Sequence, residues 1–216
     1  MKLIQDFIPI GIRRPGSSLI WSTITIHNTA NPRSDARRER LWLTNPMNTR
    51  LASWHYCVWE DEIVQAIPET EVAFHSGTRK GNNTSLSIEI CESGNYENTV
   101  ETAIDFIVDL LLKHTKGAEI LRTHFYWSGK NCPRLILPVW DEFVEKVKIL
   151  RSREEERIFV NMNKLKETEH FALPAWEFLN SIGIRIFEQR FNDNITRGEL
   201  FSLLARIYSA GGRKND

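Results

Sequence analysis

The sequence lacks any apolar run of the roughly 20 residues that a membrane-spanning helix needs, and it has no excess of either charge. Its 28 Lys and Arg residues are balanced by 28 Asp and Glu residues, which excludes a general affinity for nucleic acid or other polyanions. The N-terminal residues lack the apolar stretch and small-residue cleavage site of a signal peptide. We therefore expect a chain that is cytoplasmic at synthesis and has no membrane span.

Cysteine is scarce, with only Cys57, Cys91 and Cys132 in 216 residues. An odd count without a signal peptide argues against a disulfide framework. Cys57 and Cys91 each lie in an apolar, strand-like run, which predicts buried and inert thiols. Cys132 differs because it follows a Gly-Lys-Asn turn and precedes a proline, which places it on a loop, where functional residues concentrate.

The first 150 residues alternate between strand and helix patterns, and their length suffices for one full domain. Residues 100–111 have helical spacing, with Gly117 placed to end that helix, and Pro138 opens another helix. These patterns predict an α/β fold with a central mixed β-sheet flanked by helices. The expected strands are 23–26, 53–59, 63–67, 85–90 and 118–122.

The composition changes after residue 150. Residues 151–168 are highly charged and polar, which indicates a solvated helix end that runs into a linker. Residues 169–216 then show two helical patterns, the second opened by a capping box at positions 196–199. We expect a domain at 1–150, a connecting segment, and a small C-terminal helical domain.

Two histidines and one cysteine form a candidate metal site. His27 ends a strand, His124 follows a short strand far along the chain, and Cys132 lies on the next loop. Two imidazoles and a thiolate are a three-ligand zinc set that leaves the fourth tetrahedral position open for water. The spacing alone is weakly specific, and core histidines with an idle thiol remain the alternative.

The residues around these positions carry a family resemblance. The segments that carry it, in order, are RPG at 14–16, ITIHNTAN at 24–31, ASWHY at 52–56, QAIP at 65–68, AFHSG at 73–77, NTSLSIEIC at 83–91 and THFYWSGKNCP at 123–133. Over roughly residues 8–145, the chain resembles the zinc-dependent N-acetylmuramoyl-L-alanine amidases of the type 2 amidase family. Two residues depart from the family pattern: Phe74 stands where tryptophan is usual, and Trp54 stands where some members have a catalytic tyrosine.

The resemblance implies catalytic roles as well as ligands. By position, His27, His124 and Cys132 bind Zn²⁺, Glu89 is the general base, and Lys130 helps to hold the oxyanion. Glu89 lies on the polar side of its strand pattern, where it can exchange a proton with water. Without the resemblance, we would interpret Glu89 as an exposed acid at a strand edge and Lys130 as a solvated loop residue.

Substrate contacts are expected from polar residues near the presumed cleft. The family position of His75 suggests contact with substrate, with a structural role as the alternative. The other candidates could hydrogen-bond the stem peptide or the muramyl group, although a turn-forming role is equally open for the asparagine pair at 82–83. These candidates are Asn28, Asn83 and Thr84.

The C-terminal piece resembles a single S-layer-homology motif over residues 171–207. Trp176 and Arg197 are matching points. Such motifs bind secondary wall polymers of Gram-positive bacteria, usually as three copies, and one copy is present here. The alternative is a helical appendage that packs on the first domain or mediates dimerisation.

The resemblance as a whole predicts an enzyme that hydrolyses the amide between N-acetylmuramic acid and L-alanine in peptidoglycan. A cytoplasmic protein with a catalytic domain first and a small binding domain last is typical of a phage or prophage endolysin, which acts at the cell wall after release. Two alternatives stay open: a module that binds peptidoglycan without cutting it, and a zinc peptidase that acts on the stem peptide. Relatives that only bind typically lack the cysteine ligand, and Cys132 is present.

Overall fold

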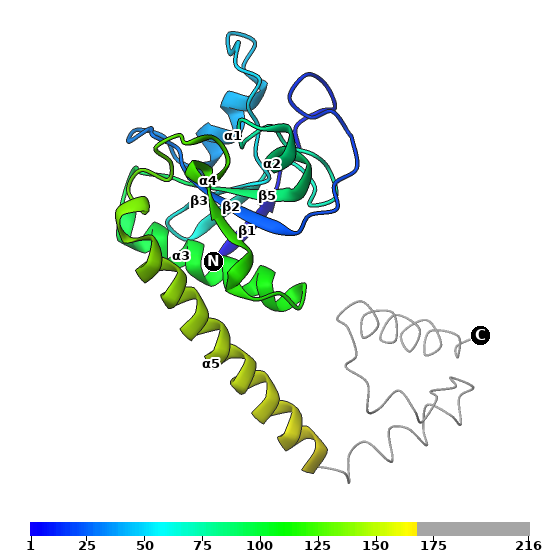
Figure 1. Cartoon of the computed structure of the whole chain (residues 1–216), viewed down its shortest axis with the longest axis vertical. Helices are drawn as coiled ribbons and strands as arrows, with labels where there is room; N and C mark the ends of the chain where they lie inside the picture. Colours follow the sequence, from blue (N-terminus) through cyan, green and yellow to red (C-terminus); the bar gives the residue numbers. More distant parts are fainter. Residues whose placement is uncertain (168–216) are drawn as a thin grey trace, which may run out of the picture. The chain divides into compact units, whose positions relative to one another are not determined.

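The computed structural model describes residues 1–167, with side chains to residue 158 (Figure 1). The chain divides into two units, residues 1–155 and 156–216, and the fold below concerns the first. The expected C-terminal helical domain, with Trp176 and Arg197, lies outside the described residues. None of the helices within 1–167 is long and apolar enough to cross a membrane.

A six-stranded sheet forms the centre of the first unit, with the strand order β1-β4-β3-β5-β2-β6. All neighbouring strands are parallel except the β3–β4 hairpin, so the sheet is mixed, as expected. The strands are β1 (Lys2–Gln5), β2 (Thr23–Asn28), β3 (Tyr56–Trp59), β4 (Glu62–Gln65), β5 (Ser85–Ile90) and β6 (Leu121–Thr123).

Helices cover both faces of this sheet (Figure 1). Two 3₁₀ turns, Ala118–Ile120 and Leu137–Val139, precede β6 and the last helix. The predicted α/β fold with flanking helices is therefore confirmed. The helices are α1 (Ala36–Thr44), α2 (Arg79–Thr84), α3 (Tyr96–Lys113), α4 (His124–Ser128) and α5 (Trp140–Glu167).

One face of the sheet carries the main apolar core. Successive side chains of a strand point to opposite faces, so Leu86, Ile88 and Ile90 of β5 share this face. They pack in one buried cluster with the apolar side of α3 and with Phe143 and Val147 of α5. Burial of this stripe explains the helical spacing of apolar residues in both helices.

The opposite face is unusually polar for a buried surface. Thr25 and His27 of β2 and Ser87 of β5 all lie there, and all three are buried. Helix α1 packs on this side through a second cluster that joins Ala36 and Leu43 to β3 and β4. Helix α4 also lies on this side, because Trp127 Nε1 donates to Thr25 Oγ1 over 2.8 Å. These helices leave room for the site described below.

Several element boundaries differ from the sequence expectations. Strand β1 was not expected, because it is largely exposed and depends on parallel pairing with β4. Helix α3 ends at Lys113, before the expected Gly117, because the chain turns at Thr115 with a φ of +52°. Residues 118–120 form a 3₁₀ turn, so only the end of the expected strand at 118–122 is extended.

Two further segments are helical where loops were expected. Arg79–Thr84 forms α2, with the Thr78 side chain accepting from Gly81 N–H as its N-cap. Helix α5 continues to Glu167, so nearly all of the segment at 151–168 is helical rather than a helix end and linker. Propensity explains the second case, because the Arg, Glu and Lys residues that fill it favour helices.

The apolar core predicts a large contrast between two isoleucines. Ile107 on α3 is 0% exposed, whereas Ile20 is 90% exposed. We expect Ile107→Ala to lower the free energy of unfolding by about 2–5 kcal/mol through lost burial and a residual cavity. Ile20→Ala should change it by less than about 0.5 kcal/mol. Urea unfolding of both variants checks this, and equal losses would contradict the assignment of α3 to the core.

Candidate metal centre

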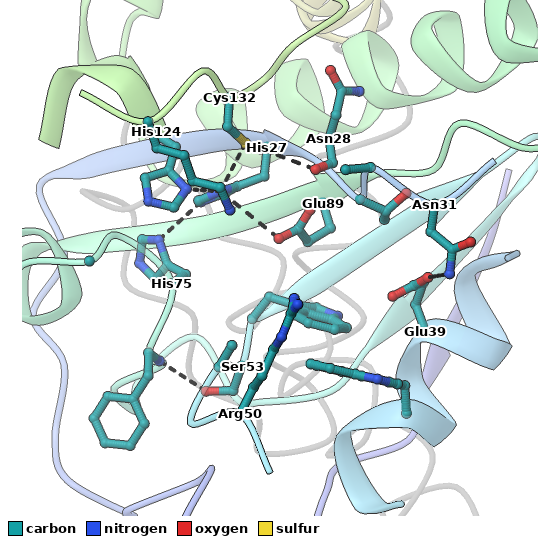
Figure 2. Close-up of a pocket in the computed structure, with 18 of the residues that line it drawn as sticks. His27, Asn28, Asn31, Glu39, Arg50, Ser53, His75, Glu89, His124 and Cys132 are labelled. Atoms are coloured by element: carbon teal, nitrogen blue, oxygen red, sulfur yellow. Dashed lines mark hydrogen bonds and ion pairs between the residues drawn. The ribbon is translucent and has the colours of Figure 1, made fainter. Parts of the chain in front are cut away.

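Parallel pairing brings the candidate ligands to one edge of the sheet. The carboxyl ends of β2, β5 and β6 lie together, where ligands bind in open α/β sheets. His27 is the penultimate residue of β2 and stands beside Glu89 of β5 in the register. His124 follows β6 directly and begins α4, with Thr123 as its N-cap. Figure 2 shows these side chains facing a common space.

Hydrogen bonds fix the loop that carries Cys132. Gly129 ends α4 with a φ of +71°, a conformation that favours glycine, and so turns the chain back. Phe125 N–H then donates to Cys132 O over 2.9 Å, and Leu135 N–H donates to Asn28 Oδ1 over 3.0 Å. The loop is thereby held against the end of β2.

The three predicted ligands converge. His27 Nδ1 lies 3.0 Å from His124 Nδ1 and 3.7 Å from Cys132 Sγ. All three ligand atoms lie within 4.8 Å of one another, and all three residues are buried. Among residues 1–158, this is the one group of three His, Cys, Asp or Glu residues with such geometry. Two nitrogens and a sulfur are donors that suit a transition metal.

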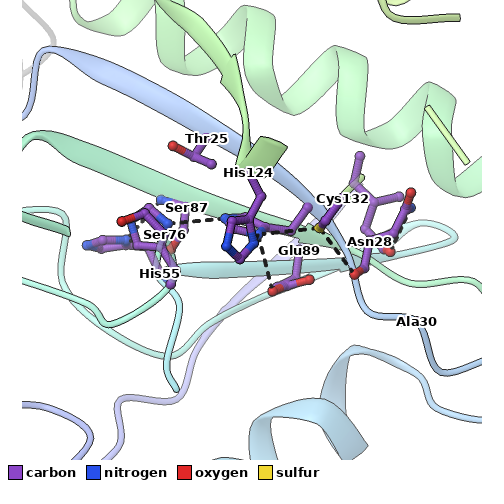
Figure 3. A network of polar contacts seen from close by, with 12 residues as sticks. Thr25, Asn28, Ala30, His55, Ser76, Ser87, Glu89, His124 and Cys132 are labelled. Carbon is purple, nitrogen blue, oxygen red and sulfur yellow. Dashed lines mark hydrogen bonds and ion pairs between the residues drawn. The ribbon is translucent and has the colours of Figure 1, made fainter. Parts of the chain in front are cut away.

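A chain of hydrogen bonds selects the ring nitrogen that His27 offers. Figure 3 shows the surrounding polar network, in which Glu89, His124 and Cys132 lie close together. His75 Nε2 lies 3.2 Å from Ser85 O, and because a carbonyl only accepts, this nitrogen carries the proton. His75 Nδ1 is then an acceptor, and it lies 3.1 Å from His27 Nε2, which must donate. His27 Nδ1 is left with a free lone pair that points at His124 and Cys132.

Burial keeps the imidazoles neutral, as metal ligation requires. It lowers the pKa of His27 well below its ordinary value and the pKa of His75 to about 3. Burial and nearby Lys130 lower the pKa of His124 to about 4, against an opposing backbone hydrogen bond at Ser76. Burial and then Glu89 raise the pKa of Cys132 to about 12, so a bound cation is needed to hold its thiolate.

Glu89 stands beside the three ligands with unused acceptor capacity. Its Oε1 lies 3.9 Å from His27 Nδ1, and its buried Oε2 has no hydrogen-bond partner among the described residues. Burial raises its pKa to about 8, helped by the charge of Glu39 and opposed by that of Lys130. A carboxyl group with a pKa near neutrality and free lone pairs can take up and release a proton.

These residues line one end of a cavity of about 790 Å³. Lys130 also lines it and is itself exposed. The cavity extends along α1 and the segment at 47–54 (Figure 2). Its lining there includes Glu39, Trp42 and Arg50, which were not predicted from the sequence as site residues. No local pattern marks Glu39, because it sits in a run of charged residues that reads as a solvated helix face.

The structure divides the expected substrate residues into two groups. His75 and Asn28 line the cavity, but the Asn28 amide is already bonded to Leu135 N–H, Ile90 O and the Tyr96 hydroxyl. Asn83 and Thr84 belong to α2 and do not line the cavity, and Thr84 Oγ1 donates to Lys80 O instead. Contact with substrate stays a prediction for His75 and Asn28. For Asn83 and Thr84, their position outside the cavity lining gives it no support.

Asn82 and His55 both lie close to the site without binding a ligand in it. Asn82 lines the cavity, where its Oδ1 accepts from the backbone N–H groups of His75 and Ser76. His55 is a satisfied core histidine: its Nδ1 accepts from Ser87 N–H and its Nε2 donates to Glu71 O. Asn82 thus orients the His75 segment, whereas His55 has no open position for a ligand.

Comparison with known proteins agrees with this geometry. A family model described as N-acetylmuramoyl-L-alanine amidase matches residues 17–135, more than half of the chain. The chain belongs to this amidase family. The match includes His27, Glu89, His124, Lys130 and Cys132.

Individual relatives cover the same part. The chain is 40% identical over 150 residues to the N-acetylmuramoyl-L-alanine amidase XlyA of Bacillus subtilis (strain 168), which covers 66% of this chain and 50% of the relative. The solved catalytic domain of XlyA has a TM-score of 0.64 and 39% identity, over 68% of this chain and 99% of that one. A mutant endolysin from Bacillus subtilis has a TM-score of 0.64 and 38% identity, over 68% and 98%. The chain thus spans about half the length of the curated relative XlyA.

The hydrogen bonds that link Ser85 O, His75 and His27 predict that His75 supports the metal site without binding metal. We expect His75→Ala to weaken the affinity for a divalent transition metal by about 10–100-fold, because His27 loses the acceptor that orients its ring. His75→Asn should lose less, since an amide oxygen can replace Nδ1 as acceptor. Competition with a chromophoric chelator measures this. His114→Ala, at the end of α3, is the control, and an unchanged affinity in His75→Ala would contradict the role.

Proposed function

We propose that the chain is a zinc-dependent N-acetylmuramoyl-L-alanine amidase that cleaves the amide between N-acetylmuramic acid and L-alanine in peptidoglycan. The observation that carries this proposal is the convergence of His27, His124 and Cys132 beside Glu89, in a cavity of a chain from this family. The name of XlyA, an amidase with which the chain shares 40% identity, supports the same reaction.

The donor set fits zinc. Two neutral imidazoles and one thiolate are a donor set typical of catalytic zinc, which has three protein ligands. His27, His124 and Cys132 would hold the ion, and it would supply a Lewis acid for the scissile carbonyl and for a water. The charge of the ion would also offset the cost of burying the Cys132 thiolate.

Proton transfer falls to Glu89. Its carboxylate accepts a proton from the attacking water and passes it to the departing amine of L-alanine. The free lone pairs of Oε2 and the polarity of this end of the cavity suit that exchange. Lys130 lies on the loop beside the ligands, where its ammonium stabilises the negative charge on the carbonyl oxygen.

We propose different functions for the two parts of the chain. Residues 1–150 catalyse, and residues 169–216 bind the wall through Trp176 and Arg197, as their resemblance to an S-layer-homology motif suggests. Similarity to an endolysin supports action at the cell wall after release from the cytoplasm. The rival for the C-terminal segment is a helical appendage that mediates dimerisation.

Metal and activity should be lost together. We expect Cys132→Ser to bind zinc much more weakly and to lose hydrolysis, because the thiolate ligand is gone. Chelation should abolish the wild-type activity, and added zinc should restore it. Cys57→Ser, which alters a buried thiol outside the trio, is the control. Full turnover by the metal-free protein would refute the mechanism.

The cleaved bond is identified by mass analysis of digested Gram-positive walls. The proposal requires glycan free of peptide together with intact stem peptides. Cuts within the stem peptide would establish the zinc peptidase instead, and binding without any cut would establish the non-catalytic module.

The general base is tested separately from the metal. We expect Glu89→Gln to keep zinc but to lower kcat by about 10²-fold or more, because an amide cannot accept the proton. Glu101→Gln, on the exposed side of α3, should leave kcat unchanged. Zinc content and initial rates on a soluble muramyl peptide measure both effects. A wild-type rate in Glu89→Gln would remove this role.

A further inference from the structure

The cavity has a second wall that the proposed reaction does not use. Beyond Glu89 it is lined by Glu39 and Trp42 of α1 and by Trp54. Figure 2 shows Glu39 on the α1 side of the cavity, away from the histidines and Cys132. Its charge nonetheless reaches Glu89, since it contributes to the raised pKa of that carboxyl group. One cavity thus connects this wall to the candidate metal ligands.

Among the described residues, no cationic side chain pairs with the Glu39 carboxylate. The residue is 7% exposed, and its hydrogen-bond partners are neutral: Asn31 Nδ2 donates to Oε1 over 3.0 Å, and a side-chain hydrogen bond with Ser34 also lowers the pKa of the carboxyl group. Within residues 1–158, no Lys, Arg or His nitrogen lies within 4 Å of it, and Arg50, although in the same cavity, does not bind it. Four other glutamates of low exposure are each paired with Lys or Arg: Glu62 with Arg37, Glu69 with Lys113, Glu71 with Arg14 and Glu92 with Arg134.

Burial of the Glu39 carboxylate without a cationic partner costs free energy, and a cationic ligand can offset this cost. A buried carboxylate is unfavourable unless it is paired and hydrogen-bonded, and burial accordingly raises the pKa of Glu39. Because the carboxylate faces a cavity rather than the apolar core, the missing positive charge can come from a bound molecule. The site thus favours a cationic group over a neutral one.

Two tryptophans complete the wall. The rings of Trp42 and Trp54 stack with centroids 5.9 Å apart and an interplanar angle of 12°. Trp42 follows Glu39 by three positions on α1, so the two side chains share a helix face. Indole rings attract cations and also pack against methylene groups. A carboxylate beside indoles suits a primary ammonium at the end of an alkyl chain.

We propose that Glu39, Trp42 and Trp54 form a subsite for the free side-chain amine of a diamino acid in the stem peptide. This inference rests on the proposed function, which places a stem peptide in the cavity. The Glu39 carboxylate accepts N–H bonds from the ammonium, and the indoles contact its alkyl chain. An amine consumed in an amide cross-link has no charge, so the subsite selects stems that are not cross-linked through this amine.

The test compares two peptides that differ only in this charge. The probes are L-alanyl-γ-D-glutamyl-L-lysine and its Nε-acetyl derivative, measured by equilibrium binding to the zinc-loaded full chain. The tripeptide lacks the muramyl amide, so its binding can be read without amidase turnover. We expect the wild type to bind the free amine about 10–100-fold more tightly, the range for a charged hydrogen bond with an aromatic neighbour.

Variants assign this preference to Glu39. Glu39→Gln should reduce the ratio of affinities to near one by weakening only the free-amine peptide, whereas Glu39→Asp should keep part of it. Glu101→Gln is the matched control and should behave as the wild type. Thermal unfolding verifies that each variant is folded. An unchanged ratio in folded Glu39→Gln, or equal affinities in the wild type, overturns the subsite.

Failure of the proposed function has a different signature. If the wild type binds both tripeptides but leaves muramyl peptides uncut, the amidase proposal fails, while the affinity ratio still decides the subsite. If muramyl peptides are cut at equal kcat/KM with free and acetylated amine, the amidase stands and the subsite is refuted.

Discussion

The parallel register between β2 and β5 is the constraint on which the site depends. It places His27 beside Glu89 and presents both on the face opposite the apolar core. Because side chains alternate along a strand, a shift of one residue in β2 would turn His27 toward α3 and bring Ile26 to the site. The apolar residues of β2 and β5 therefore position the polar ones, since their burial against α3 specifies the register.

The polar face is stable because nearly every buried donor and acceptor on it has a partner. Thr25 bonds to Ser85 and Trp127, His55 to Ser87 and Glu71, and His75 to Ser85 and His27. Among the described residues of the cavity wall, Glu89 Oε2 and Trp54 Nε1 have no hydrogen-bond partner, and Glu39 has neutral partners but no cationic one. Both carboxylates face the same cavity, so the incompletely satisfied groups mark where a metal and a substrate would complete the structure.

The family match and the candidate site lie in the same part of the chain. The amidase family match ends at residue 135, and the solved XlyA domain matches 68% of the chain. Within that part, Cys132 lies on the loop after α4, and hydrogen bonds to Asn28 and Phe125 hold this loop in place. Asn28, which was expected to contact substrate, thus anchors this loop, and it directly follows the proposed metal ligand His27 in β2.

The sequence by itself determined the elements that local pattern encodes, which are the alternation of β5 and the apolar stripe of α3. Its family resemblance predicted the grouping of His27, His124 and Cys132 with Glu89. Only the tertiary structure decided that His75 orients His27, that Asn82 rather than Asn83 lines the cavity, and that Glu39 lies near two indoles with no cationic partner in the described part of the chain. The reason is physical. Periodicity reports which face of an element is buried, whereas ring tautomers, unpaired charges and the edge strand β1 depend on partners distant in the chain.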